Sequence, residues 1–86
     1  MMGYWADKPL PVRANADHTP GAYHMDVVDL DTGERLTCVR AVDTRKGFII
    51  RYVTDGDGHM VLDRARDRAK RELVRGRFDL RWGPHA

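Results

Sequence analysis

Residues 23–62 read YHMDVVDLDTGERLTCVRAVDTRKGFIIRYVTDGDGHMVL. Short runs rich in Val, Ile, Tyr and Phe occupy residues 23–30, 35–42, 48–54 and 60–62, and compact turns containing Asp and Gly separate them. Strand-sized apolar runs between such turns are typical of an antiparallel meander. The sequence therefore predicts an all-β fold, built as a small antiparallel meander or a sandwich-like sheet.

The predicted strands differ in how their apolar residues alternate. In the first run the phase changes at Val28, which predicts a β-bulge near Val27 and Val28, because a bulge shifts the alternation by one residue. The run 48–54 has apolar residues on both faces, which predicts a central strand covered on both sides. Cys38 lies within the second run, where we expect a buried and unreactive thiol.

Residues 63–75 have two interpretations. Good helix formers fill this stretch, and Asp63 and Gly76 could begin and end a helix, which would give an α+β fold with one helix. The apolar stripe of such a helix is thin. The second interpretation, which we prefer, is a loop to about Arg68, a strand over 69–74, a tight turn and a return strand. The return strand is supported by the clean alternation of residues 77–82.

The first 21 residues have a different character. They contain three prolines and show no strand or helix period, so we expect an extended arm outside the sheet. The predicted organisation is an arm over 1–21, a single β domain over 22–82 and a tail over 83–86. The arm could pack over its own sheet or be passed to a neighbouring subunit. The arm residues predicted to contact a protein partner are Tyr4, Trp5 and Leu10.

Size and composition limit the classes of function. The chain has 86 residues and a single Cys, which predicts one domain without an internal disulfide and favours a reducing compartment. No run approaches the roughly 18 apolar residues of a membrane span. The start of the chain shows no charged region followed by an apolar one, so we expect no secretion signal, no membrane partner and a cytoplasmic location.

Positive charge is concentrated in the second half. The net charge is +2, but residues 1–43 carry four Lys/Arg against seven Asp/Glu, and residues 44–86 carry eleven against six. The basic run over 64–77 could follow a phosphate backbone, with Trp82 or Tyr52 stacking on a base. The interpretation that we prefer is a solvated face with local ion pairs, or a docking surface for an acidic protein. The candidate nucleic-acid-binding residues are Arg64, Arg66, Arg68, Lys70, Arg71, Arg75 and Arg77.

Few motifs suggest chemistry. The DTG triplet at 31–33 matches the aspartic-protease motif, but Glu34 follows it in place of a small residue, and a hairpin turn explains the triplet. Asp55, Asp57 and His59 could offer ligands to a cation, yet no closing carboxylate follows at the calcium-loop spacing, and an Asp-Gly hairpin accounts for them. The chain contains no serine. We therefore predict a protein that is not an enzyme and has no metal site and no cofactor.

Several of these segments together resemble a group of short β-rich proteins encoded in bacteriophages and prophages. In that group a turn-rich β segment precedes a charged stretch and a final strand that begins at Gly. The similarity covers residues 23–82 and is carried by residues 29–34, 39–44, 51–55 and 76–78 with Gly47, Gly58 and Trp82. The resemblance transfers no functional residue; it implies a viral accessory or virion protein, in the bacterial host cytoplasm or the virion.

These observations predict a non-enzymatic, phage-encoded module for protein interaction or virion assembly. Its partner would be a second copy, another viral protein or a host protein. The alternative is a nucleic-acid-binding module that uses the basic segment 64–77.

Overall fold

A computed structural model of the chain describes residues 3–84 and residue 86. Every strand pair in this part of the chain is antiparallel, and the prediction of an all-β fold is confirmed. The elements, in chain order, are β1 (Arg13–Asn15), a short 3-10 turn (Ala22–His24), β2 (Met25–Asp29), β3 (Arg35–Leu36), β4 (Val39–Asp43), β5 (Phe48–Tyr52), β6 (Leu62–Asp63), β7 (Arg68–Ala69), β8 (Arg71–Arg75) and β9 (Phe78–Trp82).

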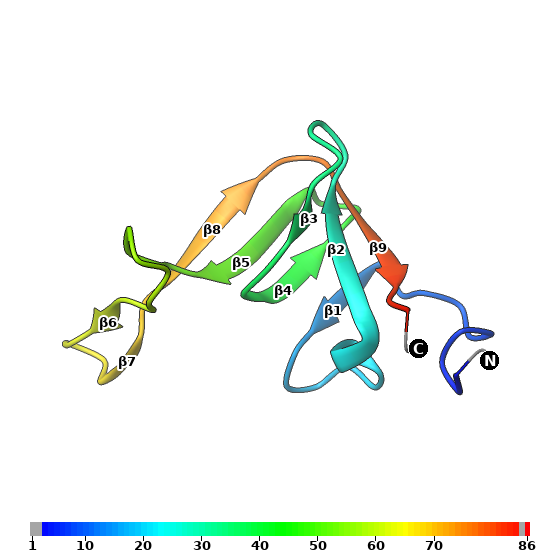
Figure 1. Cartoon of the computed structure of the whole chain (residues 1–86), viewed down its shortest axis with the longest axis horizontal. Coiled ribbons are helices and arrows are strands. Elements are labelled where there is room, and N and C mark those ends of the chain that lie inside the picture. Colours follow the sequence, from blue (N-terminus) through cyan, green and yellow to red (C-terminus); the bar gives the residue numbers. More distant parts are fainter. Residues whose placement is uncertain (1–2, 85) are drawn as a thin grey trace.

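The strands form two sheets and a separate ribbon (Figure 1). Sheet A has the order β1-β4-β5-β8, sheet B has the order β3-β2-β9, and β6 pairs with β7 in a ribbon that projects from one end of the molecule. The core brings together apolar side chains from both sheets, and Ile49 at its centre is fully buried. The buried core residues are Val27, Val42, Ile49, Phe78 and Leu80.

The segment 63–75 contains strands and no helix, so the α+β alternative is wrong. The strand predicted over 69–74 corresponds closely to β8, but the predicted return hairpin is also wrong. β8 pairs with β5, whereas β9 crosses to sheet B and pairs with β2. The bend between them lies at Gly76, where an added Cβ would come within 2.9 Å of the Phe78 ring. The chain therefore changes sheets here because glycine leaves room for Phe78 to enter the core.

The run predicted as one strand over 35–42 is divided at Cys38. This residue has φ = 58°, in the left-handed region that non-glycine residues seldom adopt, and the chain turns there from sheet B into sheet A. The Cys38 side chain is exposed, so the expectation of a buried thiol is wrong. The sequence predicts one strand here because the apolar alternation continues from β3 into β4.

The bulge predicted at Val27 and Val28 is absent from β2, which pairs with β9 in continuous register. Both valines are buried. The change in the apolar alternation at Val28 therefore reflects burial on both faces of β2, and not a residue inserted into the strand. The irregularity lies in β4 instead. There the register against β5 shifts between Val39 and Ala41 and leaves Arg40 as the extra residue.

The predicted N-terminal arm is partly incorporated into the sheet. Arg13–Asn15 form β1, which pairs with β4, so the prediction that residues 1–21 lie outside the sheet is wrong for this segment. Earlier in the arm, Leu10 packs against the core. The arm thus packs on its own chain. Residues 1–2 of the predicted arm and residue 85 of the predicted tail lie outside the described residues.

Within the described residues, no helix is long and apolar enough to cross a membrane.

Candidate functional site

The outer face of sheet A, the side turned away from the core, carries a mainly apolar row that is half-buried except at the exposed Leu73. The row Ala14, Val42, Ile49 and Val74 lies side by side across the sheet and faces the core. Because side chains alternate along a strand, the next row faces outward. That outward row is Asn15, Ala41, Ile50 and Leu73. Leu73 on β8 is 52% exposed and Ile50 on β5 is half-buried, so the expected cover on both sides of β5 is incomplete.

Two hollows lie on this face and share Ile50. A hollow of about 330 Å³ lies against β1, β4 and β5, with Phe48 and Lys46 in its lining. A hollow of about 240 Å³ lies between β8 and the β6–β7 ribbon, with Leu73 and Arg71 in its lining. The outer face is therefore hollowed on both sides of Ile50.

Arginines flank the apolar row. Arg71 and Arg75 lie on β8 on either side of Leu73 and on the same face, and Arg68 lines the neighbouring hollow. None of the three forms an ion pair within the described part of the chain. Asp43 also lies on this face, but it is buried and its carboxylate accepts the backbone N–H groups of Arg45 and Lys46 at 3.0 and 2.8 Å.

Arg71 is the most constrained of these cations. Its Nε atom is buried and has no hydrogen-bond partner in the described part of the chain, although the residue as a whole is only half-buried. A buried donor without a partner costs roughly 1–3 kcal/mol. The Arg71 guanidinium has no acidic partner within the described residues, and a carboxylate ligand that bound it would supply one.

The structure divides the predicted basic segment 64–77. Arg66, Arg68 and Arg71 line one hollow, where Arg66 lies 3.8 Å from the Asp63 carboxylate. Arg77 lies beyond the β8–β9 bend and pairs with Asp31 at 3.4 Å. The remaining members, which line neither hollow, are Arg64 in the β6–β7 turn, Lys70 between β7 and β8, and Arg75 on β8.

The two aromatic side chains expected to stack on a base already have intramolecular partners. Trp82 stacks on Trp5 and its Nε1–H donates to the Lys8 carbonyl oxygen at 2.8 Å. The Tyr52 hydroxyl accepts a hydrogen bond from Arg40 Nη1 at 3.3 Å. The Trp5 ring thus occupies one face of Trp82, whereas the contact at Tyr52 engages its hydroxyl.

The predicted partner-binding residues of the arm are largely used in intramolecular packing. Trp5 is half-buried against Trp82, and Leu10 packs on the core. Tyr4 is 73% exposed, with its ring edge-to-face on Trp5 at 5.1 Å and the Lys8 ammonium 4.3 Å from its centroid. Of the three predicted residues, Tyr4 alone offers a large free surface.

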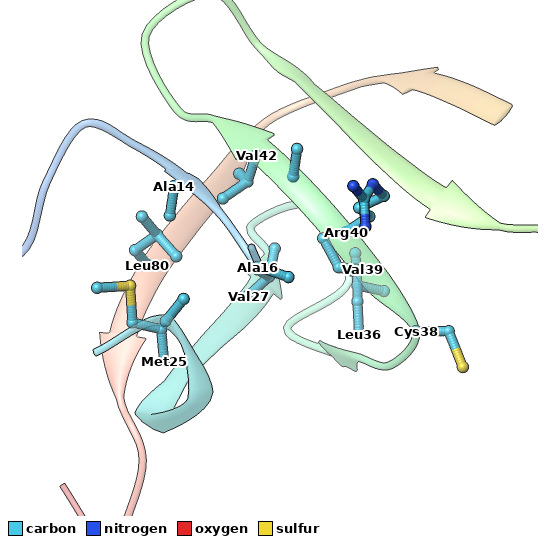
Figure 2. A pocket seen from close by; sticks show the side chains of 12 residues that line it. Ala14, Ala16, Met25, Val27, Leu36, Cys38, Val39, Arg40, Val42 and Leu80 are labelled. Carbon is cyan, nitrogen blue, oxygen red and sulfur yellow. The ribbon is translucent and has the colours of Figure 1, made fainter. Parts of the chain in front are cut away.

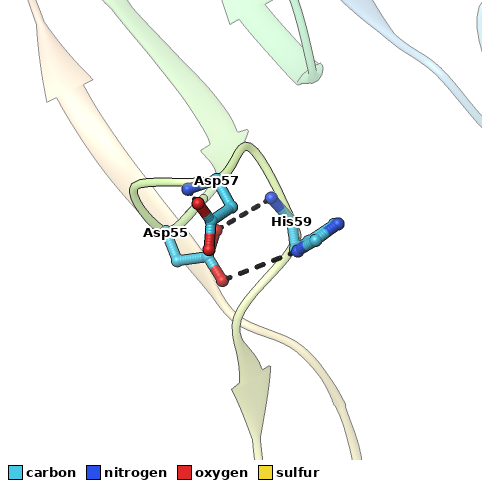
Figure 3. Close-up of side chains that lie close together, drawn as sticks. All are labelled: Asp55, Asp57 and His59. Atoms are coloured by element: carbon cyan, nitrogen blue, oxygen red, sulfur yellow. Dashed lines mark hydrogen bonds and ion pairs between the residues drawn. The ribbon is translucent and has the colours of Figure 1, made fainter.

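The side chains of Asp55, Asp57 and His59 converge in the exposed loop after β5 (Figure 3). One ligand atom from each lies within 4.8 Å of the others. The Asp55 carboxylate is already engaged, because its Oδ1 accepts the backbone N–H groups of Asp57 and His59 at 2.9 and 3.0 Å. Arg66, at the position where a calcium loop would close, lies in the separate β6–β7 turn. Turn formation accounts for the cluster.

The DTG triplet also lies in a turn. Asp31 is exposed in the connection between β2 and β3, where its N–H donates to Asp29 Oδ1 at 2.9 Å and its carboxylate pairs with Arg77. Gly33 has φ = 76°, as a tight turn requires. This environment gives Asp31 the role of a turn residue.

A third hollow, of about 190 Å³, lies between the two sheets (Figure 2). Its lining is mainly apolar, with Met25, Val27 and Leu80 among its residues, and the Cys38 sulfur points away from it. Arg40 lies at its edge with its guanidinium bonded to the Asp17 carboxylate and the Tyr52 hydroxyl, and these hydrogen bonds raise the pKa of Arg40 further into the alkaline range. The hollow is therefore an incompletely filled part of the core.

No protein-family model, no curated protein and no solved structure matches this chain. Among the described residues, the outer face of sheet A joins the exposed Leu73 and half-buried apolar side chains with two hollows and with three arginines that form no ion pair. The sequence contained the arginines as candidates but missed Phe48, Ile50 and Leu73 as site residues. The alternation in β5 placed Phe48 and Ile50 on one face, but it could not tell which face the rest of the chain would cover.

Proposed function

We propose that this protein is a non-enzymatic interaction module that binds an acidic protein partner through the outer face of sheet A. The observation that carries the proposal is the arrangement on β8, where Arg71 and Arg75 flank the exposed Leu73. Apolar side chains supply contact area, and arginines bind carboxylates through charge-assisted hydrogen bonds. The combination suits a partner that carries acidic and apolar side chains together.

Two observations favour a protein partner over a nucleic acid. The basic segment does not form one continuous track, because Arg77 is paired with Asp31 beyond the bend and Arg64 lies in the β6–β7 turn. The ring of Trp82, which could stack on a base, is already stacked on Trp5. A nucleic-acid ligand is therefore the competing outcome of the experiment below.

The resemblance to phage-encoded proteins suggests where such a contact would operate. We propose a virion or an infected bacterial cell as the setting, with a viral or host protein as the partner. This part of the proposal rests on the resemblance alone.

The proposal is tested by fluorescence-anisotropy titration at two salt concentrations. The probes are a labelled peptide, Thr-Glu-Thr-Leu-Thr-Glu-Thr, and a labelled single-stranded DNA. The variants Arg71→Gln and Arg75→Gln remove charge from the outer face, and Arg64→Gln and Arg77→Gln are matched controls from the same basic segment. All four positions are at the surface or half-buried, so we expect each variant to keep the wild-type fold. Circular dichroism of each variant checks this.

We expect the peptide to bind and each outer-face variant to weaken binding by about tenfold, the value of one charge-assisted contact. The controls should change the affinity by less than about twofold. Absence of peptide binding, or equal loss in the variants and the controls, would overturn the proposal. Steeply salt-dependent DNA binding that Arg71→Gln abolishes would replace the protein partner by a nucleic acid.

A further inference from the structure

Strand β8 is an edge of sheet A. It pairs with β5 on one side, and among the described residues no strand lies beyond it on the other (Figure 1). Five extended residues offer about 17 Å of backbone, at roughly 3.4 Å per residue. An exposed edge of this length can accept a further strand, and natural proteins usually blunt such edges with charge or cover.

The hydrogen bonds at the two ends of the β5–β8 pair determine which backbone groups point outward. The Val53 N–H donates to the Lys70 carbonyl at 2.9 Å, and the Gly76 N–H donates to the Gly47 carbonyl at 3.1 Å. In an antiparallel pair, residues that bond to the partner strand alternate with residues that do not. Residues 70, 72, 74 and 76 therefore bond toward β5, and the residues between them direct their backbone groups away from it.

The residues with outward-directed backbone groups are Arg71, Leu73 and Arg75. The same three side chains lie on the outer face, where Leu73 is exposed and the two arginines have no ion pair within the described part of the chain. The free N–H and C=O groups and the recognition side chains thus belong to the same residues. A strand added along this edge would place alternate side chains opposite a cation, an apolar residue and a cation.

We infer that β8 captures its partner by strand addition, and that the partner segment is extended and alternates acidic, apolar and acidic residues on one face. This inference rests on the proposed function, because it specifies how the acidic partner is bound. Backbone hydrogen bonds would hold the segment, and cross-strand contacts of Glu or Asp with Arg71 and Arg75 would select it. Every strand pair in the described part of the chain is antiparallel, and we assign that direction to the added strand.

A second copy of the chain is a poor occupant of this edge. Antiparallel pairing of two β8 strands about Leu73 would place Arg71 of each copy opposite Arg75 of the other. Like charges directly across a strand pair are destabilising. The arrangement therefore disfavours self-association through β8 and favours an acidic segment from another protein.

Selective N-methylation of the test peptide distinguishes strand addition from simple docking. In the peptide Thr-Glu-Thr-Leu-Thr-Glu-Thr, the central Leu would lie opposite Leu73 and direct its N–H toward β8. Methylation of that nitrogen removes one hydrogen bond and places a methyl group between the strands. Methylation of the Thr that follows Leu is the matched control, because the N–H of that Thr would point away from β8.

We expect methylation at Leu to weaken binding at least about tenfold and methylation at Thr to weaken it less than about threefold. If the two methylated peptides bind equally well or equally poorly, strand addition is overturned. The proposed function then survives where the unmethylated peptide still depends on Arg71 and Arg75. If the unmethylated peptide does not bind, both the function and the inference fall.

Discussion

The indole rings of Trp5 and Trp82 stack with their centroids 6.0 Å apart and their planes inclined by 28°. Two hydrogen bonds support the stack: Trp82 Nε1 donates to the Lys8 carbonyl at 2.8 Å, and the Trp5 N–H donates to the Ala86 carbonyl at 2.7 Å. The first described residues are thereby fastened to the last strand of the same chain. These contacts within one chain are enough to hold the N-terminal segment in place, so no neighbouring subunit is needed to position it.

Substitution of Gly21 should show how tightly this stack is packed. Gly21 has φ = 77°, and an added Cβ would lie 2.7 Å from the Trp5 ring. Gly33 has nearly the same dihedral angle, φ = 76°, but open space around its Cβ position. We expect Gly33→Ala to lower the free energy of unfolding by about 1 kcal/mol through backbone strain. Gly21→Ala should lower it by a further 1–3 kcal/mol or so through the clash, measured by urea denaturation.

A Trp5→Leu background provides the control for this comparison. Leu is smaller and should remove most of the clash, so Gly21→Ala and Gly33→Ala should then cost similar amounts. If the two glycine substitutions already cost the same in the wild-type background, Trp5 does not pack against Gly21 as described.

Arg40 should stabilise the fold through its contacts rather than its charge alone. Its guanidinium bonds to Asp17 and Tyr52, and these bonds raise its pKa. A group whose pKa is raised on folding stabilises the folded state fully below its ordinary pKa and loses this effect only as the pH rises through the raised value. Arg40→Met should therefore lower the urea midpoint by the same amount throughout the neutral range. A loss that disappears when the pH rises from slightly acidic to slightly alkaline would contradict this account.

The thiol of Cys38 should react readily in the folded protein. The residue is exposed at the turn between β3 and β4 with φ = 58°. A disulfide reagent should titrate the thiol without denaturant. Cys38→Gly should raise the free energy of unfolding by about 0.5–1 kcal/mol relative to Cys38→Ala, because glycine adopts the left-handed conformation without strain. A thiol that reacts only after unfolding would show that the strand continues through residue 38.

The loop after β5 should depend on Asp55 and not on Asp57. The Asp55 carboxylate accepts two backbone N–H groups, whereas the Asp57 side chain has no hydrogen-bond partner in the described part of the chain. Asp55→Ala should accelerate amide hydrogen exchange at residues 57 and 59, and Asp57→Ala should leave it nearly unchanged. If a cation held the cluster, Asp57→Ala would also accelerate exchange, and exchange in the wild type would slow on addition of calcium.

The sequence predicts those strands whose ends are marked by a glycine turn. Turns at Gly33, Gly47 and Gly58 all require positive φ, and glycine marks each of them. The turn at Cys38 carries no such mark, so the pattern predicts one strand where the structure has two. The destination of β9 was not predictable either, because local alternation identifies a strand but not its neighbour in the sheet.

The sequence predicts the arginines of the candidate site but not the strand edge beside them. The arginines of the basic segment stand out in the sequence, and Arg68, Arg71 and Arg75 do lie on or beside the outer face. Arg77 belongs to the same run but pairs with Asp31, because the chain bends at Gly76, between Arg75 and Arg77. The free edge of β8 depends on strand order, which is a property of the whole fold.

The most direct measurement is amide hydrogen exchange in β8, resolved by residue, with and without the peptide Thr-Glu-Thr-Leu-Thr-Glu-Thr. Strand addition predicts that the amides of Arg71, Leu73 and Arg75, which face outward, become protected when the peptide binds. Those of Glu72 and Val74, which bond to β5, should change little. Peptide binding that leaves Arg71, Leu73 and Arg75 unprotected, or that protects β9 instead, would contradict capture of the partner at β8.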